Sequence, residues 1–400
     1  MTKKKKACII VTKREKAGDG PPRRGEGLMK APCPDCMYES QGWICTEVTE
    51  GGYIMPRIAV LTSGGDSPGM NAAVTSVARN AAYYGMSLIG ISRGYNGLLS
   101  MSEKDVYEMN LDTVLDLADL PGTYLRTARC PQFMDPAYRE QAAANLRKMN
   151  VEGLVVIGGD GSFHGAQQLC NLGIPCIGIP GTIDNDLPYT ELTLGYDTAV
   201  NWDVEAVRCI RATSRSHDRP AVVEVMGRNC GDVALSTAEA TGSEIVLVPE
   251  MKWDIHDVAD RLGKLIASGN TRATIVVAEG AYASMAPFDV YEFLKPYGKT
   301  VYPGQKMDAH LLASTLKYLC HGAEVRATVI GYTQRGCQPT ARDCAFAFEA
   351  GNMAVILLKN GISNQVIGMR NNRTYHTSID TALSETRNFK ESLYNLINSL

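Results

Sequence analysis

The chain has 400 residues, of which 45% are hydrophobic and 21% charged, and 40 basic residues against 43 acidic ones give a net charge of -3. This balance suits a globular protein with a sizeable core and argues against a polybasic nucleic-acid binder, so we expect no nucleic-acid partner. No apolar run is long enough to cross a membrane, so we expect no membrane association. The 12 cysteines lie mostly in apolar stretches, which is typical of reduced thiols in the cytoplasm.

Residues 1–54 differ in composition from the rest of the chain. They hold 10 of the 40 basic residues and 7 of the 43 acidic ones, and Pro, Gly and charge dominate positions 13–34. We therefore predict an irregular extension that is disordered or only weakly structured. An alternative hypothesis starts the native protein at Met55, because residues 50–54 can be encoded by a purine-rich tract typical of a ribosome-binding site. A zinc site would need a second regular pair beside Cys-x-x-Cys, and the nearby cysteines are irregularly spaced: Cys8, Cys33, Cys36 and Cys45.

Short apolar runs alternate with segments of helical periodicity from Met55 onward. The expected strands cover residues 57–61, 87–92, 151–157, 175–179, 221–226, 244–248, 273–278 and 325–330. The expected helices cover residues 70–84, 111–120, 136–149, 166–172, 196–212, 254–267, 309–319 and 341–358. This alternation predicts an α/β fold with mostly parallel sheets, and the length favours two domains over one.

Two glycine-rich turns follow expected strands, at residues 64–66 (Gly-Gly-Asp) and 158–161 (Gly-Gly-Asp-Gly). In parallel sheets, ligands bind beyond the carboxyl ends of the strands, and glycine lets backbone N–H groups approach phosphate oxygens. Either turn alone could be an ordinary tight turn. Neither fits a common nucleotide template, because Met70 stands where a P-loop needs Lys and the glycine spacing at 159–165 is too long for a dinucleotide fingerprint.

Acidic residues lie in the second turn and in the next strand-end loop. A carboxylate beside phosphates is repulsive unless a cation lies between them, so Asp160 suggests bound Mg²⁺; the alternative is a helix cap. Residues 180–186 (Pro-Gly-Thr-Ile-Asp-Asn-Asp) fit phosphoryl transfer to an alcohol, with one Asp taking the hydroxyl proton and another assisting the metal. An Asx-rich turn would explain one of these acids. Arginines suited to phosphate groups occur near strand ends: Arg129, Arg219, Arg228, Arg326 and Arg335.

Five motifs, in order, resemble the bacterial ATP-dependent 6-phosphofructokinase family: residues 62–71, 156–162, 180–186, 223–232 and 334–336. The resemblance runs from about Met55 to near the C-terminus. It implies transfer of the ATP γ-phosphoryl group to the 1-hydroxyl of fructose 6-phosphate in glycolysis, usually by a homotetramer. It also implies two doubly wound α/β domains with the active site between them. Residues 55–194 plus 335–390 would bind ATP, and residues 195–334 would bind fructose 6-phosphate.

The resemblance also assigns roles to single residues. Asp184 resembles the general base, Thr182 lies beside the transferring phosphoryl group, and Arg129 and Arg228 complete the catalytic candidates. Positions that resemble the ATP site are Gly65, Arg129, Cys130, Gly159, Asp160, Gly161 and Ser162, with Asp160 as the Mg²⁺ residue. Positions that resemble the sugar site are Thr182, Ile183, Asp184, Arg219, Met226, Gly227, Arg228, Glu279, Arg326, Tyr332, Thr333, Gln334 and Arg335. Arg219 and Arg326 resemble arginines that reach in from a neighbouring subunit, and Arg335 resembles a ligand of the 6-phosphate.

Two glycines bear on the phosphoryl donor. Pyrophosphate-dependent relatives typically carry Asp where Gly161 stands and Lys where Gly181 stands, so volume and charge both favour ATP here. The alternatives are a pyrophosphate-dependent phosphofructokinase, another kinase with a Gly-Gly-Asp-Gly loop, and a non-catalytic nucleotide- or sugar-phosphate-binding regulator of this fold.

Some positions depart from the family pattern. Tyr332 stands where bacterial relatives often have His, and extra residues lie between Glu279 and Arg326. The family's effector site for ADP and phosphoenolpyruvate is rich in basic residues, but here uncharged residues stand at three of its basic positions: Thr75, Ser268 and Asn270. We therefore expect blunted allosteric control by these two anionic ligands.

Overall fold

The computed structural model describes residues 36–39, 42–45 and 56–399. The chain forms two units, Met1–Met55 and Pro56–Leu400. In the first unit, β1 (Cys36–Glu39) and β2 (Gly42–Cys45) pair as an antiparallel hairpin in which Cys36 lies opposite Cys45. This hairpin lies within the extension that we expected to be disordered or only weakly structured. Cys8 and Cys33 lie outside the described residues, as do most of the positions predicted to be disordered.

The larger sheet of the second unit has seven strands in the order β13-β12-β7-β6-β3-β4-β5. Its five inner strands are parallel, and the edge strands β5 and β13 run antiparallel to their neighbours. The strands are β3 (Arg57–Thr62), β4 (Ser87–Ile91), β5 (Val106–Glu108), β6 (Gly153–Gly158), β7 (Cys176–Pro180), β12 (Gln365–Arg370) and β13 (Arg373–Ser378).

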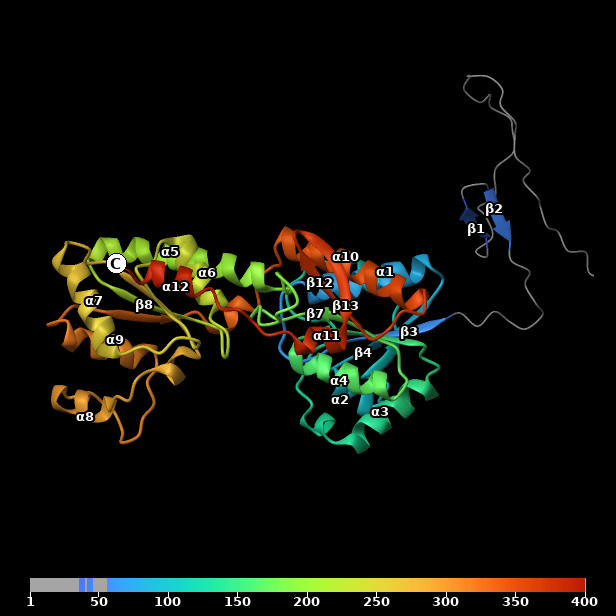
Figure 1. The fold of residues 1–400 in the computed structure, drawn as a ribbon, viewed down its shortest axis with the longest axis horizontal. Helices are drawn as coiled ribbons and strands as arrows, with labels where there is room; N and C mark the ends of the chain where they lie inside the picture. The colour runs from blue at the N-terminus through green and yellow to red at the C-terminus, as the bar shows by residue number, and fades with distance from the viewer. Residues whose placement is uncertain (1–35, 40–41, 46–55, 400) are drawn as a thin grey trace, which may run out of the picture. The chain divides into compact units, whose positions relative to one another are not determined.

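Helices cover both faces of this sheet (Figure 1). Strand β3 shows why: Ile58 and Val60 pack in one buried cluster, while Ala59 and Leu61 pack in another on the opposite face. One face carries α1 (Met70–Tyr83) and α10 (Ala341–Lys359). The other carries α2 (Tyr95–Ser100), α3 (Pro136–Lys148), α4 (Asp160–Asn171) and α11 (Ile379–Ser384).

The smaller sheet has four parallel strands in the order β11-β8-β10-β9. They are β8 (Ala221–Val225), β9 (Ile245–Leu247), β10 (Thr274–Ala278) and β11 (Arg326–Val329). The surrounding helices are α5 (Tyr196–His217), α6 (Asp232–Thr241), α7 (Ile255–Ala267), α8 (Val290–Leu294), α9 (Ala309–Leu319) and α12 (Glu391–Ile397). The prediction of an α/β protein with two mostly parallel sheets is therefore confirmed.

One predicted helix is wrong. Residues 111–120 form two short 3₁₀ turns, Leu111–Thr113 and Leu115–Leu117, with Val114 fully buried between them. Asp112 and Asp116 each stand in one of these turns, and Asp is a weak helix former that competes for backbone hydrogen bonds. The apolar periodicity therefore marks a packed irregular segment.

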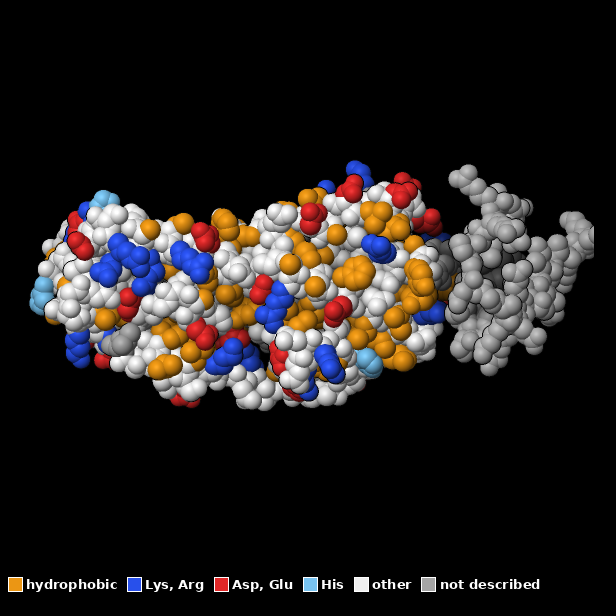
Figure 2. Space-filling model, turned by 90° about the horizontal axis from the view of Figure 1, so that it is seen from above, with side chains coloured by type: hydrophobic (Ala, Val, Ile, Leu, Met, Phe, Trp, Pro, Cys, Tyr) orange, Lys and Arg blue, Asp and Glu red, His pale blue; other side chains and the backbone are white. Residues whose placement is uncertain are grey.

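The surface carries no single dominant charge on the face seen in Figure 2. Acidic and basic side chains lie interspersed there, with hydrophobic side chains between them. Among the described residues, no helix combines the length and apolar character needed to cross a membrane.

Candidate active site

The two glycine turns lie side by side at the carboxyl edge of the seven-stranded sheet. Strands β3 and β6 are parallel neighbours, and Ser63 N donates to Ile157 O over 2.9 Å. Ser162 lies close to both turns. Its Oγ would be 3.6 Å from a Cβ added to Gly64 and 2.5 Å from a Cβ added to Gly158. This close approach requires glycine at Gly158, so the turns expose backbone rather than side chains.

The predicted base loop follows β7, the neighbour of β6 on the other side. Gly181 N donates to Gly158 O over 2.9 Å, and a Cβ on Gly159 would lie 3.7 Å from Thr182 Cβ. Within the loop, Asp184 N donates to Thr182 Oγ1 over 3.2 Å. The loop thus has a fixed conformation directly beside the second glycine turn, as the order of the strands predicts.

This loop contains two half-buried carboxylates, Asp184 and Asp186, whose charges act on each other. Burial is the main reason that the pKa of Asp184 is raised, and nearby Arg335 opposes the rise. Burial and the neighbouring charge of Asp184 raise the pKa of Asp186 to about 6. Further charges act on Asp184: Glu279, Arg129 and Arg387. This clustering of carboxylates and guanidinium groups is typical of a functional site.

Asp160 lies in the first turn of α4, whose N-cap is Gly159 without a side-chain cap. Asp160 therefore does not act as the helix cap that was its alternative role. The carboxylate is exposed, and its Oδ2 lies 3.6 Å from Nε2 of His164 one helical turn on. Together with Asp186, whose Oδ1 is buried without a hydrogen-bond partner, it supplies the oxygen donors that Mg²⁺ prefers.

No group of three or more His, Cys, Asp and Glu side chains able to hold a metal occurs among residues 56–399. Mg²⁺ commonly takes one or two carboxylates and completes its coordination with substrate phosphates and water. Asp160 and Asp186 fit that mode of binding, which does not need a cage made only of protein side chains.

The segment that carries Arg129 borders the first glycine turn. Thr127 Oγ1 donates to Gly64 O over 3.0 Å, and Asn96 Nδ2 donates to Arg129 O over 3.0 Å. The side chain of Arg129 is exposed, whereas burial raises the pKa of the Cys130 thiol. A free guanidinium therefore lies beside the glycine turn and acts on the Asp184 carboxylate.

Arg335 also reaches the first glycine turn. Its Nη1 donates to Asp66 O over 2.7 Å and lies 3.0 Å from where a Cβ on Gly65 would stand. The arginine follows β11 and a short 3₁₀ turn, Gly331–Gln334. Its role as a ligand of the sugar 6-phosphate stays a prediction, but its placement brings the segment after the four-stranded sheet next to the first glycine turn.

The predicted sugar-binding residues follow β8 and β10, which are parallel neighbours. Gly280 N donates to Gly227 O over 3.1 Å, which holds the loop containing Glu279 against the turn of Met226 to Arg228. The buried Gln334 accepts from Met226 N through Oε1 over 3.2 Å. These positions therefore meet at the carboxyl edge of the four-stranded sheet.

Three other predicted sugar-site residues differ in accessibility. Ile183 is fully buried, so only its backbone could face a ligand. Tyr332 is 84% exposed. Thr333 accepts from Trp202 Nε1 over 2.9 Å and donates to Ile330 O. Neither of the last two has a hydrogen bond to the base loop.

Two predicted residues lie elsewhere. Arg219 precedes β8 and Arg326 begins β11, so both stand at the amino edge of the four-stranded sheet, opposite the sugar-site loops. Both pair with Glu324, over 2.6 Å and 3.7 Å. Within one chain, neither arginine lies at the loop that carries Asp184.

Arg387 was missed by the sequence analysis. It ion-pairs with Asp232 and Glu250 and acts electrostatically on Asp184 and Asp186. It stands in no glycine turn or acidic loop, and it follows two polar residues in a segment without periodicity. No motif or periodicity in the sequence marks this position as part of the site.

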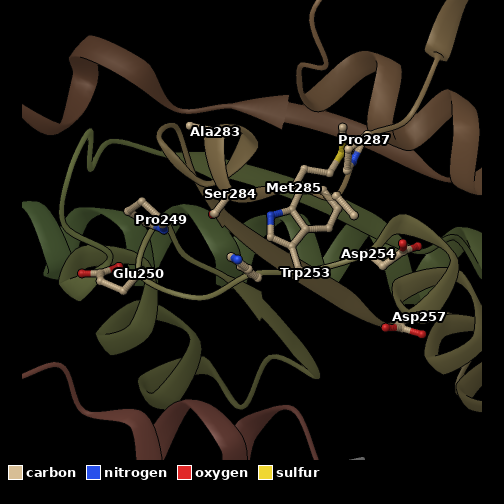
Figure 3. Close-up of a pocket in the computed structure, with 11 residues that line it drawn as sticks. Pro249, Glu250, Trp253, Asp254, Asp257, Ala283, Ser284, Met285 and Pro287 are labelled. Carbon is tan, nitrogen blue, oxygen red and sulfur yellow. The ribbon is translucent and has the colours of Figure 1, made fainter.

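A separate cavity of about 710 Å³ lies between the loops that follow β9 and β10. Figure 3 shows Glu250, Trp253 and Met285 among its lining residues. None of the residues predicted for ATP or sugar binding lines it. The cavity therefore adjoins the candidate site without containing its carboxylates.

Fold and site together define an α/β protein with phosphate-type glycine turns and a carboxylate loop at one sheet edge. The sequence profile of the family described as Phosphofructokinase matches residues 57–358, and the chain belongs to this family. It is 43% identical over 346 residues to ATP-dependent 6-phosphofructokinase 1 of Clostridium perfringens, covering 86% of this chain and 99% of that protein. It is 42% identical over 340 residues to ATP-dependent 6-phosphofructokinase of Paenibacillus macquariensis, covering 85% of this chain and 97% of that protein.

A solved structure of phosphofructokinase from Saccharomyces cerevisiae also matches, with a TM-score of 0.69 and 31% identity. The match covers 82% of this chain and 45% of the yeast chain, so this chain spans less than half the length of that protein.

Proposed function

We propose that this chain transfers the γ-phosphoryl group of ATP to the 1-hydroxyl of fructose 6-phosphate, giving fructose 1,6-bisphosphate and ADP. The observation that carries the proposal is the meeting of three strand-end segments. The two glycine turns share Ser162, and Gly159 adjoins Thr182 of the base loop. Backbone donors for phosphate and a carboxylate for the sugar alcohol therefore lie at one edge.

The space around two glycines supports ATP as the donor. No atom lies within 4 Å of where a Cβ on Gly161 would stand, so the turn leaves room for a phosphate chain. A Cβ on Gly181 would meet Met70 Cε at 2.9 Å, so a lysine would not fit without rearrangement. A pyrophosphate-dependent enzyme is the less favoured alternative.

Asp184 would act as the general base on the sugar hydroxyl. Burial raises its pKa, which makes the carboxylate a stronger proton acceptor than an exposed one, while Arg335 and Arg129 keep it from being neutralised. Mg²⁺, held by Asp160 with Asp186, would neutralise phosphate charge when bound. Arg129 would stabilise the negative charge that develops on the transferring group.

We also infer the division of labour. The glycine turns belong to the seven-stranded sheet, which supports ATP binding by residues 55–194 plus 335–390; the turn of Met226 to Arg228 belongs to the four-stranded sheet, which supports sugar binding by residues 195–334. The position of Arg219 and Arg326 at the opposite edge supports a homo-oligomer in which a neighbouring chain supplies them. The family resemblance is the ground for proposing a homotetramer. A cytoplasmic location is our further proposal, supported by the free thiols of all eight cysteines from Cys130 to Cys344.

A donor assay tests the function. Purified protein is given fructose 6-phosphate with ATP or with pyrophosphate, each with and without Mg²⁺, and bisphosphate formation is measured. We expect turnover with ATP and Mg²⁺ only. Asp184→Asn should lower kcat by roughly two to four orders of magnitude while leaving fructose 6-phosphate binding within experimental error. Turnover with pyrophosphate alone, or full activity of the variant, would reject this assignment.

A further inference from the structure

The C-terminal segment runs from one sheet to the other. Helix α11 packs on α4, β12 and β13, and α12 packs on α6 and β9 (Figure 1). Asn398 fixes the far end, because its Oδ1 accepts from Val246 N and its Nδ2 donates to Val246 O, both over 3.1 Å. Both ends of the segment 385–390 are therefore anchored.

Arg387 lies in the middle of this segment and is largely buried. Its Nη2 lies 2.5 Å from Asp232 Oδ1, and its Nη1 donates to Glu250 Oε1 over 2.7 Å. The side chains of the three residues are only 20%, 10% and 17% exposed. A planar guanidinium that joins two buried carboxylates fixes their relative position, which a single flexible ammonium group would do less well.

Glu250 holds the end of the sugar-binding turn, and Asp232 is the residue that follows directly in the chain. Glu250 accepts from Gly231 N through both oxygens, over 2.9 Å and 3.1 Å. The preceding Cys230 donates its thiol to Asp184 O over 2.8 Å. The turn is tight, because Gly227 has φ 128° and a Cβ there would stand 2.5 Å from Cys230 O. A continuous set of contacts thus links Arg387 to the backbone of the base loop.

We propose that Arg387 is a positioning residue, which holds residues 226–232 against the Asp184 loop so that the sugar-binding turn and the base face the same sugar. It acts through Asp232 and Glu250 and does not itself touch the substrate. This inference rests on the proposed function. It predicts a role in sugar binding and alignment and none in binding ATP. The contacts of Arg387 reach the turn after β8 and not the glycine turns, and its charge influences Asp186 less than burial and the neighbouring carboxylates do.

Steady-state kinetics of the full-length protein test the inference. In Arg387→Gln, we expect the KM for fructose 6-phosphate to rise between about 10-fold and 100-fold, with the KM for MgATP unchanged. Arg387→Lys should recover part of the loss, because one ion pair can still form. The matched control is Arg208→Gln, whose exposed pair with Glu205 spans 3.8 Å and which should behave as the unaltered protein.

Two outcomes would overturn the inference. One is a KM for fructose 6-phosphate within twofold of the unaltered protein. The other is a fall in kcat with both KM values unmoved, which is the result of fewer folded molecules. If Arg387→Gln does not fold, Glu250→Gln is measured in its place. The inference then requires a raised KM for fructose 6-phosphate with an unchanged KM for MgATP. Lack of turnover by the unaltered protein would instead reject the proposed function.

Discussion

Asp203 on α5 is a fully buried carboxylate without a hydrogen-bond donor for either oxygen. Burial raises its pKa from 3.8 to about 8. A buried carboxyl group is tolerated in its neutral form, whereas ionisation without a partner is costly. At neutral pH this residue is therefore protonated in the folded chain and ionised in the unfolded chain.

The sign of the pH effect follows. Stability associated with neutral Asp203 is fully present below about pH 4, is lost as the pH rises, and is gone above the folded-state pKa of about 8. Asp203→Asn cannot ionise, so we expect it to be more stable than the unaltered protein at pH 8 by on the order of 2 to 5 kcal/mol. Denaturation midpoints at pH 5, 6.5 and 8 measure this. Equal pH dependence of both proteins would contradict the expectation.

At the level of elements, Glu244, which precedes β9, connects α5, the loop before β10 and the start of β10 through its hydrogen bonds. The carboxylate accepts from both Nη atoms of Arg211 (3.1 and 3.2 Å), from Asn270 Nδ2 (2.9 Å) and from Thr274 N (2.8 Å). Arg211 is thus committed to a buried fork. The sequence retains two arginines at positions that resemble the family's effector site, Arg79 and Arg211, and the second of them is already paired with Glu244.

This pairing supports weak control by ADP. With MgATP saturating and fructose 6-phosphate below its KM, we expect ADP to change the rate by less than about twofold. A ligand shifts the equilibrium between two protein conformations only by the difference in its affinity for them, and a site with few unpaired cations gives ADP little affinity for either. Initial rates over a range of ADP concentrations, with phosphoenolpyruvate in a parallel series, measure the effect. Strong activation by ADP would contradict it.

The repeating strand–turn–helix units were predictable because buried parallel strands are continuous apolar runs with glycine at their ends. The hairpin of β12 and β13 was not, since Arg373 to Ser378 alternates polar residues and pairs only at an edge. The meeting of the glycine turns and the base loop was predictable from strand order. The contacts of Arg387 and Glu250 were not, because they depend on where the C-terminal segment crosses between the sheets.

At the scale of the whole molecule, Arg219 and Arg326 remain far from the loops that they were predicted to serve. The edge strand β11, which begins at Arg326, is exposed. Hydrophobic side chains at and beyond its carboxyl end are accessible as well: Trp202 at 42%, Val329 at 47% and Tyr332 at 84%. An unpaired strand edge with accessible aromatic side chains is typical of a surface that another chain covers. This supports sugar-phosphate sites completed between subunits.

Mixing two inactive variants tests this arrangement. Asp184→Asn lacks the base and Arg326→Ala lacks the contributed arginine, so each should be nearly inactive alone. In mixed oligomers, a base from one chain meets an arginine from the other, and activity should recover to about one quarter of the unaltered protein, the fraction expected for random pairing of two chain types. Activity equal to the sum of the separate variants would contradict a shared site.

Glu324 gives this arrangement a consequence for the substrate-free protein. Two guanidinium groups repel each other when they approach, and the carboxylate between them offsets part of that repulsion. If a sugar phosphate binds at Arg219 and Arg326, as we propose, it must displace a carboxylate already in place. Binding would then exchange one negative partner for another, which would favour a doubly charged phosphate over a singly charged ligand.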